Sequence, residues 1–310
     1  MRSKEQEAID NLRWREAKCW DMAEVFLQNR DAHGVMDMGA ELQSVFNKAS
    51  NLEYMWQAEP TVWARHSPVL FPIVGRLKDD TYNYNSKEYK MGQHGFARNK
   101  AFQVIAQTPT MVSFQLTEDE ETLSIYPFRF SLTLSYILNE QELTLQYEVK
   151  NTDTQSIYFS IGAHPGFRLP LFDNEQYEDY FISFNQAETA ESYLIAGGLI
   201  SNQTNAVFTN PNQLNLNKEI FLQDALVFKN LHANTLTLRS KNHAHGLSLT
   251  ANHFPFYGIW AQKNADFVCL EPWCGIADPV SGQSSIEQKE GINCLAVSEN
   301  FVRMLLFHFF

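Results

Sequence analysis

The sequence predicts an all-β protein that folds as one large antiparallel β-sandwich. Segments with apolar side chains at every second position recur along the chain, and no stretch alternates strands with the long helices of a parallel α/β sheet. Aromatic residues make up 13% of the 310 residues, and their rings pack well on a pleated sheet. Turn signals separate the alternating segments at residues 82–86, 210–216 and 278–282.

The clearest local pattern is a β-hairpin. Residues 130–138 and 143–149 each alternate apolar with polar side chains, and a short polar link joins them. This pattern predicts two paired strands with one apolar face and one hydroxyl-rich face. Similar runs predict strands at residues 111–116, 157–161, 235–238 and 267–270. The apolar C-terminal segment, FVRMLLFHFF, is too short to cross a bilayer and is expected to be a closing strand.

Residues 23–310 are predicted to form a single domain, preceded by an N-terminal extension at residues 1–22. The length alone would allow two domains, but no Ser/Gly-rich linker and no repeat of fixed period divides the chain. The first twenty residues carry charges throughout and contain no apolar run. They are therefore expected to form a short amphipathic helix or a disordered arm, and not a secretory signal.

Charge and cysteine content limit the partners and the compartment. The formal charge of −12 argues against binding to nucleic acid or to anionic lipid surfaces. A neutral small molecule fits this charge best, and a phosphorylated ligand would need a local basic pocket. The four cysteines, Cys19, Cys269, Cys274 and Cys294, form no CxxC pair, so reduced core thiols in a cytoplasmic protein are expected.

Four short segments each combine a turn-forming Gly or Pro with a reactive side chain. They are SPVLFPIVGR (residues 67–76), QHGFAR (93–98), GAHPGF (162–167) and LEPW (270–273). Gly and Pro restrict or specialise the backbone, which helps to fix the direction of a neighbouring side chain. Taken alone, His164 could cap a turn and Glu271 could pair with an arginine, so neither residue identifies a site by itself.

Together and in this order, the four segments resemble the aldose 1-epimerase (galactose mutarotase) family, most closely its LacX-type branch. Residues 35–44, 77–91 and 271–278 are similar to further segments of that branch, so the resemblance extends from about residue 23 to the C-terminus. It implies a galactose mutarotase-like supersandwich, with a sugar bound in an open groove. The implied partner is a small-molecule hexose, and a monomer or weak homodimer is expected.

The resemblance also implies roles for individual residues. Glu271 would be the general base and His164 the general acid. His94 and Arg76 would bind sugar hydroxyls, and Asp224 would correspond to the aspartate that grips the substrate.

Several side chains keep a structural alternative. Trp273 and Phe96 offer apolar faces to the C–H side of a sugar ring, but they could equally be core aromatics. Arg76 could form a salt bridge with Glu41 or Asp79. Arg98 is expected to be a structural ion-pair partner.

Anomer interconversion explains why an acid and a base are needed. A proton leaves the anomeric hydroxyl while another reaches the ring oxygen; the ring opens, the C1–C2 bond rotates, and the ring closes on the other face. No electron is transferred, so no cofactor is expected. Since the ordinary pKa of Glu is ~4.3 and that of His ~6.5, an ionised Glu271 beside a protonated His164 is the expected pair.

Two alternatives to this interpretation stay open at this stage. The substrate could be a hexose 6-phosphate, held by arginines such as Arg65, Arg129 and Arg168, or the protein could bind sugars without turning them over. A metal site at His243 and His245 is not expected, because no cysteine or carboxylate cluster accompanies this pair.

Overall fold

The computed structural model describes residues 25–28, 32–36, 38–282 and 285–310, so the expected extension at residues 1–22 lies outside the described residues. Within the described ranges, strands account for most of the regular structure, and the α-helix α2 (Glu120–Ile125) has six residues. The prediction of an all-β chain is confirmed. None of the described helices has the length and apolar content needed to cross a membrane.

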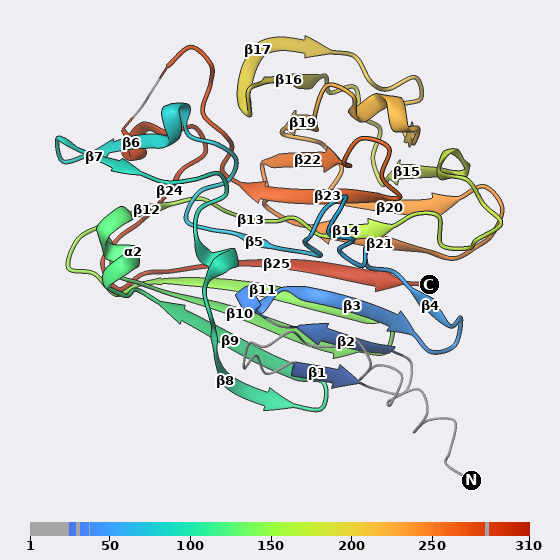
Figure 1. Cartoon of the computed structure of the whole chain (residues 1–310), viewed down its shortest axis with the longest axis horizontal. Helices are drawn as coiled ribbons and strands as arrows, with labels where there is room; N and C mark the ends of the chain where they lie inside the picture. Colours follow the sequence, from blue (N-terminus) through green and yellow to red (C-terminus); the bar gives the residue numbers. More distant parts are fainter. Residues whose placement is uncertain (1–24, 29–31, 37, 283–284) are drawn as a thin grey trace.

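Two large antiparallel sheets dominate the described part of the chain and form two layers (Figure 1). The nine-stranded sheet has the order β18 (Gln213–Asn215), β15 (Tyr180–Phe184), β20 (Thr235–Ser240), β21 (Gly246–Ala251), β25 (Asn300–Phe309), β11 (Glu142–Asn151), β10 (Phe130–Asn139), β9 (Met111–Thr117) and β8 (Gln103–Thr108). The eight-stranded sheet has the order β17 (Leu199–Asn205), β16 (Ser192–Ala196), β19 (Leu226–Lys229), β22 (Phe256–Trp260), β23 (Phe267–Cys274), β13 (Ile161–Ala163) and β5 (Val69–Leu70), and β14 (Gly166–Arg168) also pairs with β23.

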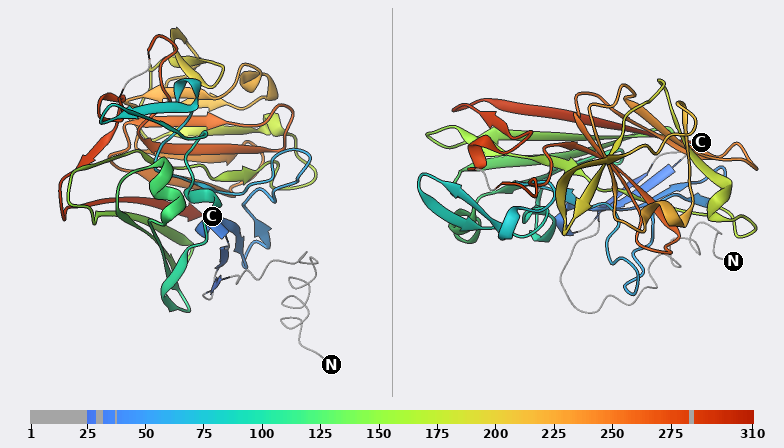
Figure 2. Two further views of the ribbon diagram at one scale, coloured as in Figure 1. Left: turned by 60° about the vertical axis from the view of Figure 1, so that its left-hand side comes forward. Right: turned by 90° about the horizontal axis from the view of Figure 1, so that it is seen from above.

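Smaller sheets complete the described fold. β1 (Val25–Gln28), β2 (Ala32–Met36), β3 (Leu42–Asn47) and β4 (Leu52–Glu53) form a four-stranded sheet, and β12 (Ile157–Phe159) pairs with β24 (Asn293–Leu295). β6 (Thr81–Tyr84) and β7 (Lys87–Lys90) form a separate hairpin. In the left view of Figure 2, the yellow and orange segments lie in the upper part of the molecule and the blue N-terminal strands in the lower part.

The predicted hairpin and closing strand are both confirmed. β10 and β11 pair along their whole length, and every second side chain, from Phe130 to Leu138 and from Leu143 to Val149, is buried. The closing strand β25 lies between β11 and β21. The run at residues 157–161 divides between β12 and β13, and the run at residues 267–270 is the first half of β23.

Strand β23 is buried on both faces, and its alternation positions the functional groups. Val268 and Leu270 pack in the large core between the two sheets. Because successive side chains of a strand point to opposite faces, Cys269, Glu271 and Trp273 point away from that core. Glu271 is therefore placed on the outer face of the eight-stranded sheet.

The described cysteines carry no disulfide. Cys269 and Cys274 are buried free thiols, as predicted, whereas Cys294 is exposed and is not a core residue. Cys294 belongs to the short strand β24, whose pairing leaves its side chain on the surface.

Candidate active site

A cavity of about 630 Å³ opens on the outer face of the eight-stranded sheet. This volume is typical of small-molecule sites. Five residues expected from the sequence line it together: His94, His164, Asp224, Glu271 and Trp273. Their segments are far apart in the sequence, and the pairing of β13, β14, β19 and β22 around β23 brings them to one place.

His164 and Glu271 face each other across neighbouring strands. Gly162 of β13 pairs with Trp273 of β23, and Gly166 of β14 pairs with Cys269 of β23. His164 lies at the corner between β13 and β14, so it lies opposite Glu271, which is between Cys269 and Trp273 on β23. The His164 Nε2 atom is 3.3 Å from Glu271 Oε2. The two side chains are almost fully buried, yet both contribute to the cavity wall.

Burial changes the protonation of this pair. Desolvation raises the pKa of Glu271 well above its ordinary value, the nearby Asp224 carboxylate raises it further, and Trp273 opposes the shift. Desolvation lowers the pKa of His164 to about 3, and the charge of Arg98 acts in the same direction. Burial therefore favours a protonated carboxyl beside a neutral imidazole, and not the ion pair expected from ordinary pKa values.

His94 is fixed as a hydrogen-bond donor to the cavity. The ring atom Nδ1 accepts the Gly75 N–H at 3.1 Å, and the backbone N–H of His94 donates to the Gly75 carbonyl at 2.8 Å. Desolvation, with the nearby His164 and Arg98, lowers the pKa of His94 well below its ordinary value, so the ring is neutral. A neutral ring that accepts at Nδ1 carries its proton on Nε2.

The backbone around His94 needs the glycine that follows it. His94 and Gly95 both have positive φ, 66° and 69°. A Cβ on Gly95 would lie 2.3 Å from the Phe71 carbonyl oxygen, so this close approach excludes a side chain. The HGF motif therefore allows the loop that carries His94 to pack directly against the backbone of Phe71, in the segment that precedes Gly75.

Asp224 lies at the cavity beside strand β19. Its φ of 96° is unusual for a residue other than glycine, and its Oδ1 atom accepts the Ala225 N–H at 2.7 Å. Backbone strain of this kind clusters at functional sites, which is consistent with a substrate-binding role. Among the described residues, its other carboxylate oxygen forms no hydrogen bond or ion pair, and Asp224 lines the cavity, so this oxygen is available to a ligand.

Two glycines allow the Trp273 indole to lie flat on the sheet. A Cβ on Gly162 would be 2.6 Å from Trp273 Cδ1, and a Cβ on Gly258 would be 2.4 Å from Trp273 Cζ2. Glycines at these two positions leave room for the ring on both neighbouring strands. The indole forms part of the cavity wall beside Glu271.

Removing this space should weaken substrate binding. We expect Gly258→Ala to push the Trp273 ring out of position at a cost of about 1–3 kcal/mol, and to raise KM about tenfold. Steady-state kinetics with a neutral hexose measure the change. Gly282→Ala is the matched control, because a Cβ there meets nothing within 4 Å. Equal KM values in the two variants would contradict the prediction.

The other two expected residues lie elsewhere. Arg76 is bound through Nε and Nη2 to the Asp80 carboxylate, both at 2.9 Å, instead of to Glu41 or Asp79. Its aliphatic stem lies beside Gly198, a cavity residue, so Arg76 is at the rim. Phe96 is buried and packs against an aromatic cluster of Phe71, Tyr126 and Phe130.

Three further residues of the cavity wall were not predicted from the sequence, Trp63, Trp260 and Lys263, and a fourth, Arg98, was expected to have a structural role only. Trp63 stacks on the His164 ring with centroids 5.0 Å apart, and Trp260 meets the same ring edge-on at 5.5 Å. No local motif marks Trp63 or Trp260, because their contact with His164 depends on how distant strands pair. Arg98 could have been predicted as a cavity residue, because it is the last residue of the QHGFAR segment.

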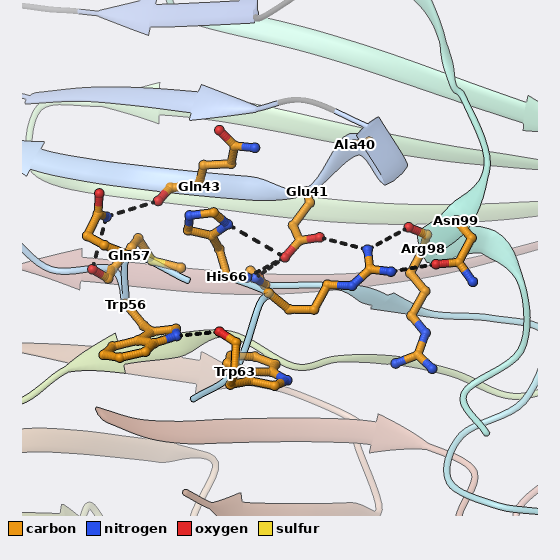
Figure 3. Close-up of polar contacts among 12 residues, drawn as sticks. Ala40, Glu41, Gln43, Trp56, Gln57, Trp63, His66, Arg98 and Asn99 are labelled. Atoms are coloured by element: carbon orange, nitrogen blue, oxygen red, sulfur yellow. Dashed lines mark hydrogen bonds and ion pairs between the residues drawn. The ribbon is translucent and has the colours of Figure 1, made fainter. Parts of the chain in front are cut away.

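A buried carboxylate, Glu41, ties down the segment that carries Trp63 (Figure 3). It accepts the backbone N–H groups of His66 and Ser67, and the His66 carbonyl accepts the Gly166 N–H at 2.8 Å, two residues after His164. Glu41 also faces the Arg65 guanidinium at 3.5 Å. These bonds fix the loop that carries Trp63, whose ring stacks on the His164 imidazole.

Arg98 differs from the other arginines considered for an anionic substrate. Arg65 is engaged with Glu41 and with the Arg98 carbonyl, Arg129 pairs with Glu118, and Arg168 pairs with Asp173; none of them lines the cavity. Among the described residues, Arg98 has no ion-pair partner, and its buried Nε atom has no hydrogen-bond partner. Figure 3 shows its guanidinium directed away from the Glu41 contacts. The expected structural ion pair is therefore not formed in the described part of the chain.

Known proteins share this fold and sequence pattern. The sequence profile of the aldose 1-epimerase family matches residues 28–291. The chain is 32% identical over 262 residues to the plasmid-encoded protein LacX of Lactococcus lactis subsp. lactis, covering 81% of this chain and 87% of that protein.

Solved structures agree with the sequence match. A galactose mutarotase related enzyme from Lactobacillus acidophilus superposes with a TM-score of 0.88 at 34% identity, covering 93% of this chain and 97% of that chain. A galactose mutarotase-like protein from Lactobacillus casei gives a TM-score of 0.88 at 29% identity, covering 93% and 100%. The predicted galactose mutarotase-like sandwich is confirmed, and the chain belongs to the aldose 1-epimerase family.

Proposed function

We propose that this protein is an aldose 1-epimerase that interconverts the α and β anomers of a hexose by general acid–base catalysis. The observation that carries the proposal is the buried pair of His164 Nε2 and Glu271 Oε2, 3.3 Å apart on the wall of a 630 Å³ cavity. Anomer interconversion needs one group that takes a proton and one that gives a proton within reach of the same ring. A protein that only binds sugar has no need for such a pair.

His164 and Glu271 can supply both the general acid and the general base while the pair holds a single exchangeable proton. The neutral pair and the ion pair contain the same number of protons, and transfer from Glu271 to His164 interconverts them. As a carboxylate, Glu271 takes the proton of the anomeric hydroxyl; as an imidazolium, His164 gives a proton to the ring oxygen. After rotation about the C1–C2 bond, the two groups exchange roles and the ring closes.

Other wall residues would position the sugar. His94 presents its Nε2 proton to a sugar oxygen, since its Nδ1 is held by Gly75. Asp224 offers a carboxylate oxygen to sugar hydroxyls, and the flat Trp273 indole offers an apolar surface to the C–H face of the ring. Arg76 is at the rim and would reach a hydroxyl only from its bidentate contact with Asp80. Phe96 supports the His94 loop from the core.

Polarimetry on freshly dissolved α-glucose and α-galactose tests the proposal directly. Catalytic amounts of protein should accelerate the decay of optical rotation above the spontaneous rate. A sugar-binding protein without turnover would leave the decay unchanged at catalytic concentration, and that result would refute the enzymatic proposal.

The pH dependence of kcat/KM should reflect the buried pair. The active form carries one proton on the pair; a second proton adds only near the lowered pKa of His164, about 3, and the single proton leaves only above the raised pKa of Glu271. We therefore expect no loss of kcat/KM as the pH is lowered through the ordinary histidine value of ~6.5 to about 4. Rates are measured in this range with circular dichroism as a check on folding. A decline in activity centred near pH 6.5, the ordinary histidine value, would contradict the prediction.

A hexose 6-phosphate is the second candidate substrate, and Arg98 is the observation that favours it. Its guanidinium lines the cavity without an acidic partner among the described residues, and Lys263 lines the same cavity. A guanidinium can hold two phosphate oxygens at once. Polarimetry with α-glucose 6-phosphate beside α-glucose distinguishes the two substrates.

Arg98→Gln separates the two candidates further. If the phosphate binds at Arg98, the variant loses a charge-assisted hydrogen bond of about 1.5–3 kcal/mol, so KM for the phosphorylated sugar rises about 10–100-fold while KM for glucose changes little. Arg129→Gln, at the exposed pair with Glu118, is the control. Equal effects of Arg98→Gln on both sugars would exclude a phosphate site at this residue.

A further inference from the structure

Cys269 adds a third metal-binding atom to the catalytic pair. Its Sγ atom, one imidazole nitrogen of His164 and one carboxylate oxygen of Glu271 all lie within 4.8 Å of one another. Cys269 and Glu271 share a face of β23 because they are two residues apart, and the Gly166–Cys269 pairing brings the thiol next to the His164 corner. All three side chains are buried.

We propose that Cys269, His164 and Glu271 form a binding site for a thiophilic divalent cation, with Zn²⁺ as the representative ion, and that the cation competes with the sugar. A set of one sulfur, one nitrogen and one oxygen donor suits Zn²⁺ and disfavours Mg²⁺ and Ca²⁺, which prefer all-oxygen sites. This differs from the sequence-based expectation of no metal, which considered only His243 and His245. In the structure, His243 Nε2 is bound to Glu175 Oε2 at 2.8 Å.

The distances allow tetrahedral coordination after a small movement. Bonds of about 2.0–2.3 Å to sulfur, nitrogen and oxygen place neighbouring ligand atoms about 3–4 Å apart. His164 Nε2 and Glu271 Oε2, at 3.3 Å, already meet this spacing. The longest separation in the trio therefore has to close by about 1 Å, within the reach of side-chain rotation.

The direction of the site explains why binding would inhibit. His164 and Glu271 line the cavity and Cys269 does not, so a cation held by all three would leave its fourth coordination position for the side of the cavity, where the sugar would bind. A cation held there occupies the lone pairs that the acid and the base need. Inhibition rests on the proposed epimerase function, but cation binding itself does not.

Cobalt spectroscopy tests the site without any activity measurement. Co²⁺ replaces Zn²⁺ in such sites, and a thiolate ligand gives a charge-transfer band in the near ultraviolet. We expect one Co²⁺ per chain and this band in the wild-type protein and in Cys274→Ala, but no band in Cys269→Ala. Cys274 is the matched control because it is a buried cysteine of the same strand on the opposite face. A band that persists in Cys269→Ala, or a wild-type protein without a band, would overturn the proposal.

Polarimetry then tests the consequence. Zn²⁺ should inhibit wild-type turnover competitively with sugar, and Mg²⁺ at the same concentration should not. For each protein, inhibition is expressed relative to its own metal-free rate. On that scale, Cys269→Ala should need more than about tenfold more Zn²⁺ for half-inhibition than the wild type does. Unchanged Zn²⁺ sensitivity in Cys269→Ala would overturn the role of the thiol. If the protein has no turnover, the epimerase proposal fails while the cobalt spectrum still decides the metal site; if turnover is present and the band absent, only the metal site fails.

Discussion

Glu271→Gln is expected to lower kcat by about 10²–10⁴-fold, the range that a positioned general acid or base contributes. Glutamine keeps the volume and the planar shape of the side chain, but its amide neither takes nor gives a proton at neutral pH. The carboxyl is buried and favoured in its neutral form, so a neutral amide should be tolerated by the fold. Polarimetric kcat and thermal unfolding of the same preparation separate the loss of chemistry from a loss of folding.

The partner variant should behave in the same way. His164→Asn removes the other proton-transfer group, and the double variant should be little slower than either single variant, because residues that act as a unit lose their effect together. Near-normal turnover in both single variants would end the assignment of Glu271 and His164.

The chain provides a matched control for this experiment. Buried Glu175 and half-buried His243 form a second carboxylate–imidazole pair, with Oε2 and Nε2 2.8 Å apart, and neither residue lines the cavity. Glu175 accepts hydrogen bonds from Ser240 and Tyr180, which help to lower its pKa. Glu175→Gln should therefore affect stability and leave kcat within about twofold of the wild type.

The alternation of apolar and polar residues was sufficient to predict those strands that pair with a neighbour close in the sequence. The period-2 alternation of residues 130–149 defines both strands of a hairpin whose turn is only a few residues long. Strand β23 was recognised through residues 267–270, but its second half, which carries Glu271, was not. The EPW segment does not alternate apolar with polar residues, because both faces of this strand are buried.

The convergence of His164 and Glu271 could not be derived from local pattern. It depends on the register of β13 and β14 against β23, which are about a hundred residues apart in the chain. The resemblance to a family supplied this information, and it supplied nothing for Trp63, whose ring stacks on His164 from a loop without a motif. Register between distant strands is set by the whole sheet, so single segments do not contain it.

Burial explains why protonation and ion pairing were also misjudged. The expected ion pair of Glu271 and His164 relied on ordinary pKa values, and desolvation shifts both groups toward their neutral forms. Arg98 was expected in a structural ion pair, yet it lines the cavity and has no ion-pair partner among the described residues. The sequence shows which residues can carry a charge, but the burial and the neighbours that decide their protonation follow only from the packed structure.

Lys289→Met is expected to lower the free energy of unfolding by about 3–5 kcal/mol, the cost of leaving one partner of a buried ion pair alone. Lys289 Nζ lies 2.8 Å from Asp278 Oδ1 and also donates to the Ile276 carbonyl, and both charged side chains are no more than 3% exposed. Desolvation lowers the pKa of Lys289, and Asp278 opposes that shift, so the lysine depends on this carboxylate for its charge. Chemical denaturation of the variant and the wild type measures the difference.

The double variant Asp278→Asn/Lys289→Met shows whether the loss comes from an uncompensated charge. Asparagine removes the charge left by Lys289→Met and can still accept the Lys78 N–H that the Asp278 carboxylate binds at 3.0 Å. The double variant should therefore recover part of the stability that the single variant loses, as the coupling of a charge pair requires. If it is no more stable than Lys289→Met, the buried carboxylate is not the source of the loss. Because Ala277 beside Asp278 lines the cavity, Lys289→Met should also raise KM, and the double variant should reverse part of that rise together with part of the lost stability.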